Sequence, residues 1–261
     1  MRAFRVFARG LVDFYDEMLL LVGMNLVWTF LSAIISIVIF VPLDLLLANL
    51  IGPSFLFDFA WRLLENLGIV DILGPLAIPV ILAPLMLTPN PATAGVYYVT
   101  HRIARERRVY FSDFIEGMRR YFFRSLLLLF ANLLIFALLL TNILFYTFNP
   151  WLPSIFRYAA IIWLYGLFLW VEMQLYGLPL LMEQSNKSIL IVLRNAVLLV
   201  MSDPLYTTIF VVFLLGINVL SAMLTLPIFF LTCSLTSILS NKALVERLRE
   251  IRGEEEEEAI V

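Results

Sequence analysis

Five long stretches with no charged side chain, or with a single one, constrain this chain more than any other feature. The first lies between Glu17 and Asp44, and the others cover residues 72–100, 125–156, 158–182 and 204–241. About 20 apolar residues in a helix span the hydrocarbon core of a bilayer, which is about 30 Å thick. Lipid offers backbone amides no hydrogen-bonding partner, so a segment that crosses it must satisfy its own backbone as a helix. The five stretches are therefore predicted to be membrane helices.

The composition excludes the main alternatives to a helical membrane protein. The chain is 62% hydrophobic and 15% charged, whereas soluble domains are about half apolar and about a quarter charged. A transmembrane β-barrel would alternate apolar and polar residues, but these stretches are apolar at successive positions. The predicted fold class is an all-α, polytopic membrane helix bundle.

The last apolar stretch decides the predicted number of spans. A single helix over its 38 residues would be about 57 Å long, well beyond the hydrocarbon core. Pro227 offers a break between two shorter helices. We predict six spans, with five as the runner-up, and the six cover about residues 18–43, 72–100, 125–148, 158–182, 205–223 and 228–240.

The distribution of basic residues predicts the orientation. With six spans, sixteen of the 18 Lys and Arg residues fall on one side of the membrane. With five spans the split is only 12 to 6. Because basic residues concentrate in cytoplasmic loops, we predict that both termini are cytoplasmic.

Several segments flank the predicted spans. Residues 1–17 are predicted to form a helix on the membrane surface, since apolar side chains recur at helical spacing from Phe4 to Met18. Residues 54–66 are predicted to form an outer interfacial helix. Residues 185–203 are too short and too charged to span, so we expect a cytoplasmic helix under the bundle. The glutamate-rich end, 253–261, is predicted to be disordered.

The largest predicted cytoplasmic segment, residues 101–124, is strongly basic. Ser112 or Asp113 is expected to cap a helix within it. Arginines at a membrane edge bind lipid phosphates or dock a partner protein, and nucleic acid is not expected at such a position. The residues assigned to this docking or lipid contact are Arg105, Arg107, Arg108, Arg119, Arg120 and Arg124.

The second predicted span contains a helix stop and restart. Thr88 or Asn90 can cap a new helix, and Pro91 suits its first turn. A break at membrane depth leaves backbone amides unpaired beside the positive end of the helix dipole. Such breaks line a cavity in transporters, although a proline kink packed by its neighbours gives the same sequence pattern.

Glu172 is the one acid near the middle of a predicted span. Burying its charge in lipid is costly, so the side chain is expected to face the bundle interior. It can serve a proton- or cation-coupled site, or join two helices by a hydrogen bond. We hypothesise that it meets the amides near Asn90. The candidate intramembrane polar site comprises Glu172, Asn90, Thr93, Asn25 and Asn132.

Enzyme signatures are absent from the sequence. His101 is the only histidine, which excludes histidine-based triads and multi-histidine metal sites. No glycine loop able to cradle a phosphate is present. We predict that the protein is not an enzyme and has no metal or cofactor.

Short motifs carry a family resemblance. The segment Pro91-Ala92-Thr93-Ala94-Gly95-Val96-Tyr97-Tyr98 precedes a basic stretch and Phe111-Ser112-Asp113-Phe114, and Arg194-Asn195-Ala196 and Asp203-Pro204 follow later. This pattern resembles the YesL-like family of bacterial integral membrane proteins, whose molecular function is unknown. Members are often encoded beside carbohydrate ABC importers. The resemblance implies an accessory role in carbohydrate uptake at the bacterial plasma membrane, with an ABC-type permease or sensor subunit, or a second copy of the chain, as partner.

Two other functions are compatible with the sequence. The chain can be an independent secondary transporter or channel that uses Glu172 and the broken second span, or a membrane scaffold without a ligand. A water-accessible cavity joining Glu172 and Thr93 would favour the transporter. A tightly packed bundle with grooves on the cytoplasmic side would favour the accessory protein.

Overall fold

The computed structural model describes residues 2–51, 62, 65, 88–148, 151, 153–184, 188–224, 227 and 230–253. Across these residues it contains α-helices and one 3-10 helix, and no strand, which confirms the all-α class. The elements are α1 (Arg2–Asp16), α2 (Met18–Ile51), α6 (Pro91–Ala104), α7 (Phe111–Phe148), η2 (Ser154–Tyr158), α8 (Ala159–Glu183), α9 (Ile189–Ser202), α10 (Pro204–Leu224) and α12 (Thr232–Arg252).

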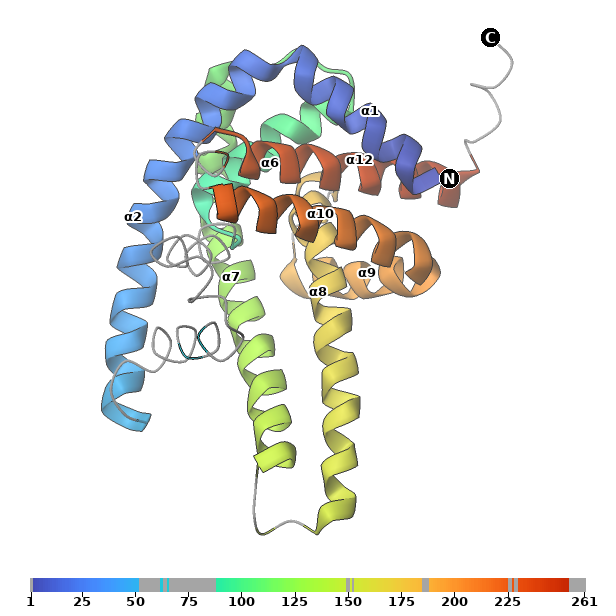
Figure 1. Cartoon of the computed structure of the whole chain (residues 1–261). Coiled ribbons are helices and arrows are strands. Elements are labelled where there is room, and N and C mark those ends of the chain that lie inside the picture. The colour runs from blue at the N-terminus through green and yellow to red at the C-terminus, as the bar shows by residue number, and fades with distance from the viewer. Residues whose placement is uncertain are drawn as a thin grey trace.

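The helices form two groups that differ in direction. The long helices α2, α7 and α8 run down the view of Figure 1, and η2 lies at the lower end of the α7–α8 pair. The helices α1, α9, α10 and α12 run across this direction near the upper end, where α6 also lies. We call α1, α6, α9, α10 and α12 the helical cap. The N-terminus and the end of α12 both belong to it.

Among the described residues, four helices are long and apolar enough to cross a membrane. They are Met18–Leu46, Phe111–Thr147, Ala159–Glu183 and Pro204–Ser221. Only 17% to 33% of the most apolar 18-residue part of each helix is buried within the protein. A stripe of large apolar side chains along α7 is exposed, formed by Leu127, Phe130, Leu134 and Leu138. Apolar surface on this scale marks contact with lipid or a partner in a folded protein, which fits a helical membrane protein.

The prediction of six spans does not hold, because the described residues include four helices of membrane length. The runner-up of five spans stays a prediction, because the first part of the second predicted span lies outside the described residues. The described part of the second predicted span belongs to α6, a 14-residue helix that is almost wholly buried. The sixth predicted span, 228–240, runs into α12, and the later half of α12 is rich in charged residues. Both segments are apolar because they pack against protein, which composition alone does not distinguish from contact with lipid.

Local capping chemistry sets the start of α7. Asp113 is its third residue, and the Asp113 Oδ2 atom accepts a hydrogen bond from the Tyr110 backbone N–H at 2.8 Å. This is the reach-back half of a capping box, and it is made by Asp113 rather than Ser112. From this start α7 continues unbroken for 38 residues, so the predicted cytoplasmic helix and the span 125–148 are one element.

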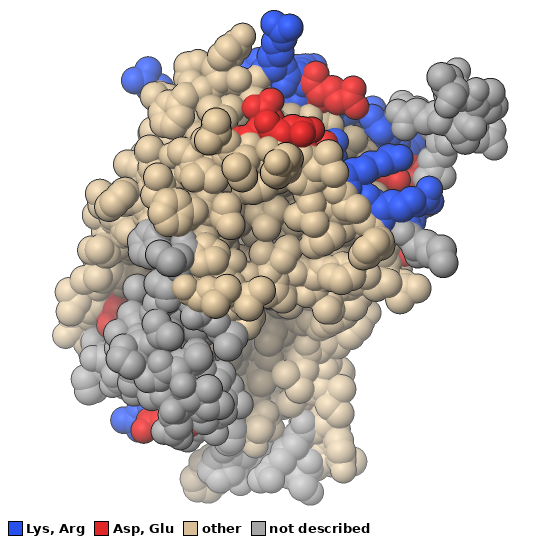
Figure 2. Space-filling model, turned by 45° about the horizontal axis from the view of Figure 1, so that its top comes forward, with Lys and Arg blue, Asp and Glu red and all other residues tan. Residues whose placement is uncertain are grey.

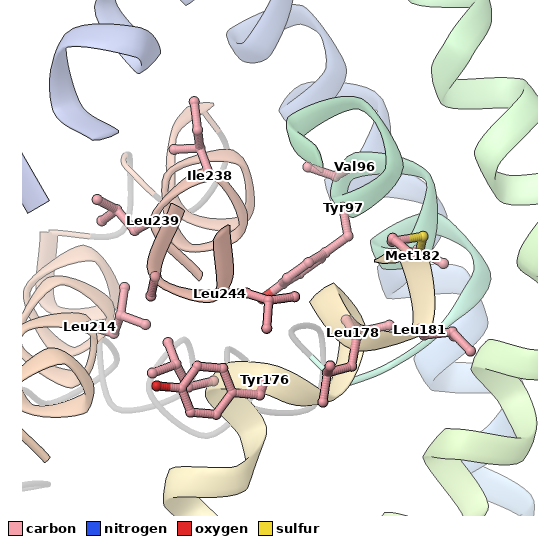
Figure 3. Close-up of a cluster of buried hydrophobic side chains, with 14 of the residues drawn as sticks. Val96, Tyr97, Tyr176, Leu178, Leu181, Met182, Leu214, Ile238, Leu239 and Leu244 are labelled. Atoms are coloured by element: carbon pink, nitrogen blue, oxygen red, sulfur yellow. The ribbon is translucent and has the colours of Figure 1, made fainter. Parts of the chain in front are cut away.

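A cluster of buried side chains packs the helical cap against the C-terminal end of α8. Figure 3 shows Tyr97 of α6 reaching toward Leu244 of α12, above Tyr176 and Leu178 of α8. Tyr176 and Leu244 are fully buried. Burial of each such side chain contributes about 1.5–3 kcal/mol. This core therefore places α6, α8 and α12 relative to one another.

The predicted surface helix at 1–17 corresponds to α1, and only part of the face predicted to be apolar packs against the protein. The residues buried against the protein are Ala3, Val6, Gly10 and Phe14, whereas Phe4 and Leu11 are exposed. A Cβ atom at Gly10 would lie 2.7 Å from Leu239 Cδ2. Small residues let α1 approach α12 closely, while Phe4 and Leu11 remain exposed, where a surface helix contacts lipid.

The helix expected under the bundle within 185–203 is α9, whose apolar residues Ile189, Val192 and Ala196 are buried. Other predicted segments lie outside the described residues. These are the outer helix at 54–66 apart from Arg62 and Glu65, the first part of the second predicted span, and the acidic end after Gly253.

Candidate functional site

The predicted helix restart is present at the beginning of α6. Asn90 is the N-cap, and its Oδ1 atom accepts a hydrogen bond from the Thr93 N–H at 3.0 Å. Pro91 occupies the first turn. Trp28 of α2 donates its indole N–H to Thr93 Oγ1 at 3.0 Å, and Ser32 of α2 lies within 3.4 Å of the Asn90 side chain. All five residues are buried, so the restart is packed by α2.

Asn25 lies in a second buried contact, between α2 and the start of α12. Its Oδ1 atom accepts a hydrogen bond from the Ser234 N–H at 2.9 Å, and Ser234 Oγ donates to the Leu21 carbonyl at 2.9 Å. Two turns further along α12, Asn241 Nδ2 donates to Thr100 Oγ1 of α6 at 2.9 Å. Polar side chains of α12 thus bond α2 and α6. Sequence reasoning missed Ser234 and Asn241 because they lie more than 130 residues from their partners.

Asn132 joins the two long helices of the α7–α8 pair. The Gln174 Nε2 atom donates to Asn132 Oδ1 at 2.9 Å, and Asn132 Nδ2 donates to the Leu128 carbonyl of its own helix at 2.9 Å. Hydrogen bonds of this kind between membrane helices stabilise by about 0.6–2 kcal/mol. Asn132 therefore serves helix packing and contacts neither Asn90 nor Glu172 in the described structure.

Glu172 is fully buried and lies against α10. Its Oε1 atom is 2.5 Å from Thr208 Oγ1, and Thr208 also lies 2.8 Å from the Pro204 carbonyl. Its Oε2 atom is buried with no hydrogen-bond partner among the described residues. The hypothesis that Glu172 meets the amides near Asn90 is therefore corrected: Glu172 joins α8 to α10, while Asn90 and Thr93 bond to α2.

Replacing Glu172 with glutamine is expected to leave the free energy of unfolding within about 1 kcal/mol of the wild type. The amide oxygen can still accept from Thr208, and the substitution removes the ionisable group from the buried site. Alanine at the same position removes the contact and leaves a void, with an expected loss of about 2–3 kcal/mol. The stability of both variants is measured by thermal unfolding of the detergent-solubilised protein, with size-exclusion chromatography as the readout. Equal losses for the two variants would mean that the contact requires the carboxyl group.

The predicted basic segment divides into two groups. Arg105 forms an ion pair with Glu183 at 2.5 Å, and Arg107 lies beside it in a pocket. The other group, Arg119, Arg120 and Arg124, is exposed on the first turns of α7. Arg108 is exposed between the two groups. Figure 2 shows most of the visible Lys, Arg, Asp and Glu side chains gathered over the end of the molecule that carries the helical cap, with a few others at the lower left.

A buried arginine that sequence reasoning missed connects α12 to the turn before α10. Arg247 is 3% exposed, and its Nη2 atom donates to Ser202 Oγ at 2.8 Å. Its Nη1 atom pairs with Asp203 at 3.3 Å and with Glu250. In the sequence, Asp203-Pro204 stands out only as part of the family resemblance, and no local pattern indicates a partner 44 residues away.

Comparison of the chain with protein-family models, with curated proteins and with solved structures found no match.

Proposed function

We propose that this protein is an accessory membrane component associated with carbohydrate uptake, as its resemblance to YesL-like proteins implies, and that the end of the molecule that carries the basic residues of the helical cap faces the cytoplasm. The orientation follows from charge. The first turns of α7, the helix α1 and the later half of α12 carry most of the basic residues and lie at one end. Basic residues favour the cytoplasmic side, and this argument does not depend on the number of spans.

The observation that carries the accessory role is an exposed face on the first turns of α7. Arg119, Arg120, Phe123 and Arg124 share this face, with Phe123 82% exposed. Arg119 and Arg124 form no ion pair among the described residues. Arginine and aromatic side chains are the residues enriched at the centre of protein interfaces. The proposed partner is an ABC-type permease or sensor subunit.

The internal polar contacts also favour an accessory protein over a transporter. A shared translocation site would bring Glu172 and the start of α6 together. Instead Glu172 bonds to Thr208, and Thr93 bonds to Trp28. The polar groups at the helix restart are occupied by side chains of α2, which matches a packed kink.

Reversing the charge of the α7 face tests this function. The variant Arg119→Glu/Arg120→Glu/Arg124→Glu is expected to recover the importer subunit from native membranes at least about tenfold less well than the wild type. The measurement is mild-detergent purification after crosslinking, with partners quantified by mass spectrometry. The matched control, Arg5→Glu/Arg9→Glu/Arg194→Glu, changes the same charge at other exposed sites. Recovery of the wild type alone, or only as a homo-oligomer, would contradict the accessory role, as would equal losses in both variants.

A secondary transporter or channel is the second candidate, because one carboxylate oxygen of Glu172 is buried without a partner in the described structure. An ionisable group inside a span marks an ion or substrate pathway in many transporters. Flux measured in reconstituted vesicles, and abolished by Glu172→Gln, would favour this function over both the accessory protein and a scaffold without a ligand.

A further inference from the structure

A basic pocket lies where three helices end. Its volume is about 290 Å³. The last turn of α6, the last residue of α8 and the last residue of α12 all contribute to it. The lining residues are His101, Arg102, Arg105, Arg107, Glu183 and Arg252. No apolar side chain is among them, so the pocket suits a charged or strongly polar ligand.

The arginines of the pocket outnumber the acids that pair with them. Arg102 is paired with Asp113 at 2.5 Å, and Arg105 is paired with Glu183 at 2.5 Å. Arg252 lies 3.9 Å from the same Glu183 carboxylate, and its side chain is 53% exposed. Arg107 has no ion pair in the described part of the chain. Two guanidinium groups, those of Arg107 and Arg252, are therefore left without an acid of their own.

The negative helix ends help to hold the arginines in place, but some guanidinium N–H donors remain without an acceptor. Each helix C-terminus carries about half a negative charge, which favours cations in the last turn and offsets part of the surplus positive charge that an anion would meet. Arg102 and Arg252 benefit from this at the ends of α6 and α12. A guanidinium group has five N–H donors, so the cluster retains donors that one carboxylate, Glu183, does not satisfy.

We propose that this pocket binds a phosphate group, carried either by a phospholipid headgroup or by a soluble phosphorylated ligand. Arginine binds phosphate oxygens through paired N–H donors, and these hydrogen bonds are about twice as strong as neutral ones. The pocket volume lies just below the range of about 300–1,000 Å³ that is typical for drug-sized ligands. Glu183 ends α8, one of the membrane-length helices, so the pocket lies at the depth where lipid phosphates are found.

The test compares two probes on the full-length protein in an uncharged detergent, with the glutamates after Gly253 retained so that their competition is included. The first probe is inorganic phosphate, titrated against chloride at equal ionic strength and followed by thermal stability. The second is phosphatidylglycerol, followed by native mass spectrometry against phosphatidylcholine. Saturable binding of inorganic phosphate, without preferential binding of phosphatidylglycerol, identifies a soluble ligand. Selective retention of phosphatidylglycerol identifies the headgroup.

The variant Arg107→Gln/Arg252→Gln removes the two surplus charges without breaking the Arg102 and Arg105 pairs. It is expected to weaken binding of whichever probe saturates by about tenfold or more. The control Arg108→Gln/Arg124→Gln removes the same charge from exposed positions outside the pocket and is expected to bind within about twofold of the wild type. Failure of both probes to bind saturably would overturn the proposal, as would equal weakening by both variants. Neither result bears on the partner experiment at the α7 face.

Discussion

Replacing Arg247 with alanine is expected to lower the free energy of unfolding by about 3 kcal/mol, at the lower end of the range for breaking a buried ion pair. The side chain of Arg247 is 4% exposed, whereas those of Asp203 and Glu250 are each 31% exposed. Water therefore solvates the two carboxylates in part after the arginine is lost, which limits the loss of stability. Ser202 loses its donor as well. The apparent melting temperature in detergent is the measurement.

Arg249 provides the matched control for this experiment. It lies two residues away on α12, is only partly buried, and forms no ion pair among the described residues. Arg249→Ala is expected to change the free energy of unfolding by less than about 0.5 kcal/mol. A drop as large as that of Arg247→Ala would show that general loss of positive charge, rather than the Asp203 and Glu250 contacts, destabilises the cap.

Adding one methyl group at Gly95 is expected to destabilise the protein strongly. A Cβ atom there would lie 2.8 Å from the Phe114 backbone oxygen and 2.9 Å from the Phe114 ring. On the facing helix, a Cβ atom at Gly117 would lie 2.5 Å from Tyr98 Cβ. The backbone of α7 cannot move locally, so Gly95→Ala must push α6 and α7 apart. We expect the free energy of unfolding to fall by about 3 kcal/mol.

Gly216→Ala, on α10, is the control with the opposite expected sign. Nothing lies within 4 Å of a Cβ atom at that position. Alanine is the better helix former by about 1 kcal/mol, so this variant is expected to raise the apparent melting temperature. A loss for Gly95→Ala no larger than about 1 kcal/mol would mean that the close approach of α6 and α7 is not needed for stability.

Features that depend on local chemistry were predictable from the sequence. Helical secondary structure follows from uncharged stretches that need internal hydrogen bonds. The restart of α6 follows from Asn90 and Pro91, since a cap and its amide are only three residues apart. The separate helix α9 follows from an apolar segment that is too short to span a membrane.

The candidate site was less predictable because its contacts are long-range. Glu172 was identified from its position within an apolar helix, and it is fully buried. Its partner is 36 residues away on α10, and no pattern in either segment selects Thr208 over other polar residues. The same holds for the division of the arginines, since Arg105 turns toward Glu183 only because α6 and α8 end side by side.

The sequence by itself determined an all-helical chain rich in apolar helices, the position of the helix restart and the concentration of basic residues in a few segments. Only the tertiary structure decided which apolar segments face protein and which remain exposed. It places α6 and the first half of α12 inside the cap and leaves the stripe on α7 outside. The physical reason is that a side chain buried in protein and one facing lipid leave water with similar free energies, so hydropathy does not separate them, whereas packing between residues far apart in the chain does.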